Sequence, residues 1–131
     1  LFPYKELLMA SIADRVLDNG LTILDTEANR VDLTSQEATS FASATSTHTL
    51  GNKTSISIGS PADRSGGGRK VTLAAITDGS ITGTGTATHY AITDTTNSRL
   101  LVTGALTASQ SVNSGNTWSL NALDIGIPDP S

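Results

Sequence analysis

The hydrophobic pattern of the chain changes after Glu27, from helical spacing to the alternation that is typical of strands. The order Ser11-Ile-Ala-Asp14 fits a capping box and predicts a helix over residues 11–19. Asn19-Gly20 favours a helix end at that point, whereas the apolar residues of segment 21–24 favour an extension to Glu27. The apolar residues at helical spacing are Ile12, Val16 and Leu17.

Beyond the helix, short segments alternate between apolar and polar residues and are separated by turn residues. Connections of hairpin length imply antiparallel pairing, because parallel strands need long crossovers. The sequence therefore predicts a mainly β fold, an antiparallel β-sandwich or partial barrel with one short N-terminal helix. The expected strands cover residues 30–35, 53–58, 69–77, 81–93, 99–104, 106–112 and 117–125.

Turn chemistry fixes the expected connections between these strands. Asp78-Gly79 predicts a type I′ hairpin turn, and Asp94–Ser98 and Ser114–Asn116 predict two further turns. Residues 60–68 read as a loop with three consecutive glycines, and residues 36–47 fit either a short helix or a loop. The inward-facing residues of the first strands are expected to be Val31, Leu33, Ile56 and Ile58.

Composition narrows the class of protein. The chain has 16 Ser and 20 Thr among 131 residues, and only 15% of its residues are charged. Such a composition is typical of extracellular β modules and virion proteins, and most enzyme domains carry more charge and more aromatic residues. The net charge of -4 and the scattered basic residues argue against nucleic-acid binding, which needs clustered Lys and Arg. The absence of Cys excludes disulfides, thiolate metal sites and a Cys nucleophile.

The length fits one β-rich domain over residues 10–131, preceded by an arm over residues 1–9. No apolar run is long enough to span a membrane, and the arm lacks the features of a signal peptide. The first Met is Met9, so we expect either a natural start there or a processed chain. The apolar arm residues form a candidate interface with a neighbouring subunit: Leu1, Phe2, Tyr4, Leu7 and Leu8.

Residues with catalytic or metal-binding chemistry do not form a recognisable motif. His48 and His89 lack the spacing of a metal site, and no Gly-x-Ser-x-Gly elbow is present. Glu27 and Glu37 are the only carboxylate pair worth weighing, and most Asp residues fall in turns. We therefore expect no enzyme activity, no cofactor and no bound metal.

Three further segments have a functional and a structural interpretation. Gly66–Lys70 faintly resembles a phosphate loop, but its spacing is wrong and a strand follows it. Asp94, Asn97 and Ser98 could hold calcium weakly, although a plain turn explains them better. Tyr90 and Trp118 could form a sugar-stacking surface, but single aromatics in such strands more often fill the core.

Several segments of the chain form one recognisable pattern, namely residues 13–18, 68–72, 82–92, 97–101, 114–117 and 123–130. Together these segments resemble a family of small structural proteins from tailed bacteriophages and prophages. The resemblance covers about residues 10–130, and the arm before Met9 departs from it. It implies a virion component, of the capsid decoration or auxiliary type, without a catalytic signature.

Two functions follow as expectations. The first is a capsid decoration protein on the virion surface, which binds the major capsid protein and copies of itself as a dimer or trimer. The second is a tail or fibre module that binds a host surface carbohydrate through Tyr90, Trp118, Arg69 and the loops at 60–68 and 94–98. Neither expectation involves nucleic acid or a membrane.

Overall fold

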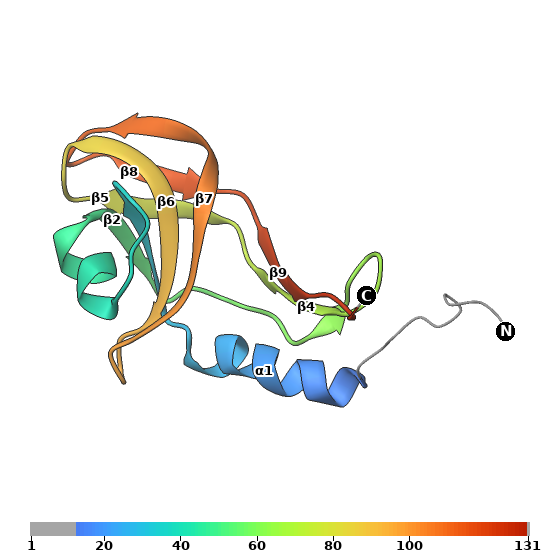
Figure 1. The fold of residues 1–131 in the computed structure, drawn as a ribbon. Coiled ribbons are helices and arrows are strands. Elements are labelled where there is room, and N and C mark those ends of the chain that lie inside the picture. Colours follow the sequence, from blue (N-terminus) through green and yellow to red (C-terminus); the bar gives the residue numbers. More distant parts are fainter. Residues whose placement is uncertain (1–12, 131) are drawn as a thin grey trace, which may run out of the picture.

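The computed structural model describes residues 13–130 and shows a mainly β protein with antiparallel sheets and one N-terminal helix (Figure 1). About 50% of the chain is strand and 17% is helix. The larger sheet curls into a half-barrel, which confirms the expected fold class in its partial-barrel form. The arm residues 1–9 lie outside the described residues.

Helix α1 (Asp14–Glu27) includes the extension that the apolar pattern allowed. The predicted end at Asn19-Gly20 is wrong, because the helix continues for two turns beyond it and buries Leu21 and Leu24. The predicted capping box is also wrong, since Ala13 occupies the N-cap position without a side-chain cap. Burial against strand β4 (Arg69–Leu73), rather than capping, therefore decides the length of this helix.

In the described part of the chain, nine strands form two sheets, and every pairing in them is antiparallel. The six-stranded sheet has the order β7-β6-β1-β2-β5-β8, and the three-stranded sheet has the order β3-β4-β9. The strands are β1 (Arg30–Thr34), β2 (Thr49–Thr54), β3 (Ala62–Asp63), β4 (Arg69–Leu73), β5 (Ile76–Ile81), β6 (Gly85–Asp94), β7 (Arg99–Val112), β8 (Thr117–Leu120) and β9 (Leu123–Ile127).

A single bent ribbon connects the two sheets. Strands β4 and β5 follow each other with a break at Ala74–Ala75, and β8 and β9 follow each other with a break at Asn121–Ala122. Because β4 pairs with β9 and β5 pairs with β8, the ribbon leaves the half-barrel and continues as the smaller sheet (Figure 1). This bend divides each of two predicted strands: 69–77 becomes β4 and the start of β5, and 117–125 becomes β8 and most of β9.

The predicted hairpin turn at Asp78-Gly79 is wrong, because both residues lie inside β5. Other boundaries also differ from the expectation. The strand predicted at 81–93 begins later, as β6 at Gly85, because Ile81 is the last residue of β5. The strand predicted at 53–58 begins earlier, as β2, and ends before Ser55, which has a positive φ of 57°. The strands predicted at 99–104 and 106–112 form one strand, β7, with an irregular register opposite Ala87–His89.

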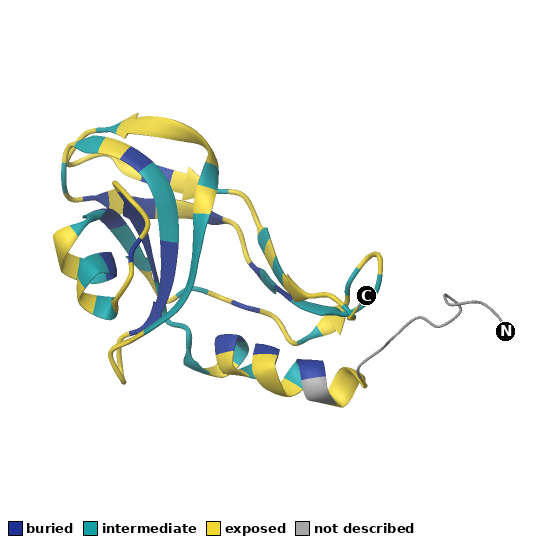
Figure 2. Cartoon of the chain, in the orientation of Figure 1, coloured by how far each residue is buried: buried dark blue, intermediate teal, exposed yellow. Residues whose placement is uncertain are grey.

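The hydrophobic core lies inside the half-barrel and continues under α1 (Figure 2). Val31 and Leu33 point into it, as the alternation of β1 predicted. The outer face of β1 is also buried, because the short helical segment η1 (Ser43–Thr47) covers it with Ala44. The buried residues of the main cluster are Leu21, Leu24, Val31, Leu33, Leu50, Ile58, Val71, Leu73, Ile76, Ile81, Ala87, Ile92 and Trp118.

Candidate functional site

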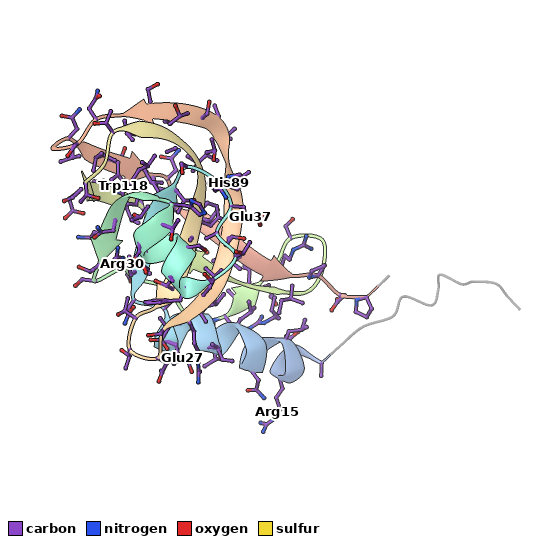
Figure 3. All side chains as sticks on the ribbon, turned by 60° about the vertical axis from the view of Figure 1, so that its left-hand side comes forward. Arg15, Glu27, Arg30, Glu37, His89 and Trp118 are labelled. Carbon is purple, nitrogen blue, oxygen red and sulfur yellow. The ribbon has the colours of Figure 1, made fainter. Side chains whose placement is uncertain are left out.

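Trp118 lies on β8 and points into the half-barrel, with only 6% of its surface exposed (Figure 3). Its indole covers Gly79 on the adjacent strand β5, where a Cβ atom would overlap the ring. The indole Nε1 is buried and has no hydrogen-bond partner. The ring of Trp118 is therefore used mainly for packing.

Tyr90 lies on β6 and packs against the same core in a second aromatic–glycine pair. Its ring and hydroxyl occupy the space that a side chain at Gly104, its partner on β7, would need. Burial raises the pKa of the Tyr90 phenol above its ordinary value, because the phenolate would lose hydration. Tyr90 is thus half-buried and supports the wall of the half-barrel.

Arg69 lies on β4, in the smaller sheet, and contacts three carboxylates from two elements, α1 and β3. Its Nε is 2.8 Å from Asp18 on α1, and its Nη1 is 2.6 Å from Asp63 on β3 and 3.7 Å from Asp14. The hydrogen bond with Asp18 is the main cause of the raised pKa of the Arg69 guanidinium. Arg69 therefore ties the helix to the sheet. The structure places it in a different sheet from Tyr90 and Trp118.

The other residues with possible chemistry are engaged in local structure. The Asp94 carboxylate accepts hydrogen bonds from the backbone N–H groups of Thr96 and Asn97, which is the pattern of a turn. The His89 Nδ1 is 2.8 Å from the Thr88 hydroxyl oxygen. Within residues 13–130, no three His, Asp or Glu side chains are grouped as metal ligands.

Glu27 and Glu37, the candidate carboxylate pair, contact different residues. Glu37 accepts a hydrogen bond from the Thr103 hydroxyl on β7, and Glu27 lies 3.5 Å from Arg99. The triple-glycine segment, whose three residues all have positive φ, leads into β4 rather than a helix. A phosphate loop would need a helix at that point, so the segment serves as a connection between strands.

A groove of about 530 Å³ lies between β7 and β8. These strands are the two edges of the six-stranded sheet, so the groove is the gap in the wall of the half-barrel. None of its lining residues is charged. The lining residues are Leu33, Leu106, Thr107, Ala108, Gln110, Ser111, Val112, Thr117, Trp118, Ser119, Leu120 and Asn121.

Both edges of the gap belong to an uncharged part of the chain. From Leu100 to Leu123 the sequence contains no charged residue, no His and no Pro. Sequence reasoning missed this surface, although the uncharged run was a visible signal for it. The fold was needed to show that the run supplies both edges of the same sheet.

Comparison of the chain with protein-family models, curated proteins and solved structures finds no match. The resemblance to phage structural proteins therefore stays a prediction from the sequence. Among residues 13–130, no helix is long and apolar enough to cross a membrane.

Proposed function

We propose that this protein is a non-enzymatic structural component of a tailed-phage virion, which decorates the capsid by binding the major capsid protein and copies of itself. The observation that carries the proposal is the pair of open, uncharged sheet edges at β7 and β8. Such edges offer unpaired backbone groups for strand addition, which is a docking mode rather than a chemical one. The sequence resemblance supplies the virion context.

The engagement of the polar residues also supports a binding role. Arg69, Asp94 and Glu37 are each held by hydrogen bonds to neighbours within the fold. A decoration protein needs a stable scaffold and repeated weak contacts, which add up over a symmetric shell. The proposed partners exclude nucleic acid, consistent with the net charge of -4.

The arm is proposed to contact the major capsid protein. Leu1, Phe2, Tyr4, Leu7 and Leu8 lie outside the described residues, and their apolar character is the reason for this assignment. Association with phage shells that lack the protein tests the function directly. The purified protein should sediment with such shells, and the full-length variant Leu7→Ser/Leu8→Ser should do so less. Failure of the wild-type protein to bind shells would refute capsid decoration.

The groove gives a second candidate function, a tail or fibre module that binds a neutral host carbohydrate. Its lining combines apolar residues with uncharged hydrogen-bonding groups, such as Gln110 and Asn121. This combination suits a sugar, which presents both apolar faces and hydroxyl groups. Titration with host surface polysaccharide should then quench the fluorescence of Trp118, the only Trp. The variant Gln110→Ala should weaken that binding.

A further inference from the structure

The two sheets of this protein differ in the chemistry of their edges. The edges of the smaller sheet carry charge and proline, which discourage pairing with another chain. Strand β3 has only two residues, follows Pro61 and ends at Asp63, and β9 contains Asp124 and precedes Pro128. This sheet is therefore protected on both sides.

The larger sheet lacks this protection along its long edge. Strand β8 is short, with 4 residues, whereas β7 has 14 residues and its only charge is at the first position, Arg99. An edge of this length without charge or proline is a ready template for another strand. Because the whole chain has a net charge of -4, copies repel each other less where they meet along a strand without acidic residues, such as β7.

The regular part of this edge is short and well defined. Residues Val102–Ala105 pair in continuous register with His89–Ile92 of β6, and irregularities lie on either side. Val102 and Leu106 are partly buried and pack against the core, whereas Ala105 is exposed. Within residues 13–130 no strand pairs with the free side of β7, and the Glu37 carboxylate contacts this strand through the Thr103 hydroxyl.

We propose that β7 pairs with β7 of a second copy, antiparallel and across a two-fold axis near Gly104. This register would place Val102 of each copy beside Leu106 of the other, so that the two cores continue into each other. Thr103 would lie beside Ala105 of the second copy on the opposite face. Antiparallel self-pairing of one strand satisfies two-fold symmetry, because each copy offers the same surface. It also places Arg99 of each copy opposite an uncharged part of the other strand.

Strand β7 would thus be the surface for the self-association proposed above, and its pairing does not depend on binding to the shell. The test uses full-length protein and sedimentation equilibrium. The variant Ala105→Glu places two carboxylates near each other across the axis, while in a single copy the residue stays exposed. Its dimer dissociation constant should rise at least about tenfold, since like charges across a strand pair repel.

Two controls make the result specific. Ala75→Glu adds the same charge at another exposed alanine, in the break between β4 and β5, and should leave the dissociation constant unchanged. An equimolar mixture of Ala105→Glu and Ala105→Lys should restore association, because the opposite charges then face each other. Restoration would also show that the variants remain folded.

The outcomes separate self-pairing from the function. A wild-type protein that stays monomeric at about 100 µM, where weak contacts become populated, would overturn the self-pairing. Equal association of the wild type and Ala105→Glu would overturn it too. If Ala105→Glu loses shell binding but still dimerises, the edge belongs to the shell protein and the self-pairing is wrong. Loss of dimerisation with retained shell binding supports both the inference and the decoration function.

Discussion

Trp118 on β8 lies over Gly79 on β5 and occupies the space of its missing side chain. The two residues are direct cross-strand partners near the open edge of the half-barrel. Gly79 is itself buried, and the indole closes the core at this position. An aromatic ring over a cross-strand glycine compensates for the packing that glycine cannot provide.

The variant Gly79→Ala should therefore displace Trp118. We expect a loss of about 1–3 kcal/mol in the free energy of unfolding, because a methyl group is forced into a filled site. Urea denaturation measures this loss, and the emission of the single Trp should shift to longer wavelength. Gly59→Ala is the matched control, since nothing lies within 4 Å of a Cβ there. Equal stability of the two variants would contradict the packing role.

The pair of Tyr90 and Gly104 predicts coupling between two substitutions. Gly104→Ala should destabilise the protein by about 1–3 kcal/mol through overlap with the tyrosine ring. In the background Tyr90→Ala the same change should cost less, by at least about 0.5 kcal/mol, because the ring is gone. A double-mutant cycle by chemical denaturation measures the difference. Additive effects of the two substitutions would refute the proposed overlap.

Arg30 and Asp32 form an ion pair at the centre of the sheet, and the Asp32 side chain is fully buried. Arg30 binds both carboxylate oxygens, at 2.7 and 2.8 Å, and the Thr49 hydroxyl donates to the same carboxylate at 2.6 Å. The hydrogen bonds with Asp32 raise the pKa of the Arg30 guanidinium. The pair satisfies a charge that the fold has removed from water.

Arg30→Met should thus lower the free energy of unfolding by about 3 kcal/mol, because it leaves the Asp32 carboxylate buried without its cation. Arg15→Met, at an exposed position of α1 (Figure 3), should change it by less than about 0.5 kcal/mol. The double variant Arg30→Met/Asp32→Leu should recover part of the loss, since no charge remains buried. Thermal unfolding of the three variants provides the measurement.

The Asp94 turn predicts how stability depends on pH. The side chain of Asn97 donates to the carboxylate and, with the backbone N–H groups, holds the pKa of Asp94 below its usual range despite burial. The unfolded chain therefore takes up a proton first as the pH falls. The contribution of Asp94 to stability is present above about pH 4 and is lost as the pH falls through its lower folded value.

Asp94→Asn should consequently be less stable than the wild type at pH 7 and lose this deficit towards pH 3. The reason is that protonation removes from the wild type the charge that the variant already lacks. Urea midpoints measured between pH 7 and pH 3 give the comparison. A constant difference over this range would show that the carboxylate charge does not stabilise the turn.

The amino-acid sequence determined the features that depend on neighbouring residues. Alternation in β1 placed Val31 and Leu33 in the core, and the turn residues at Asp94–Ser98 connect two strands as predicted. Connections of hairpin length were sufficient to predict antiparallel pairing. These features are local, because side-chain direction and turn conformation are set by a few consecutive residues.

Only the tertiary structure decided which residues far apart in the sequence contact and bury each other. Asp78-Gly79 has the local chemistry of a hairpin turn, but it lies within a strand because Trp118 fills the space above the glycine. The helix continues past Asn19-Gly20 because Leu21 and Leu24 are buried by the fold. The uncharged segment 100–123 became a candidate binding surface only when the curl of the sheet exposed both of its edges. Burial and strand order are properties of the whole chain, and a local pattern does not contain them.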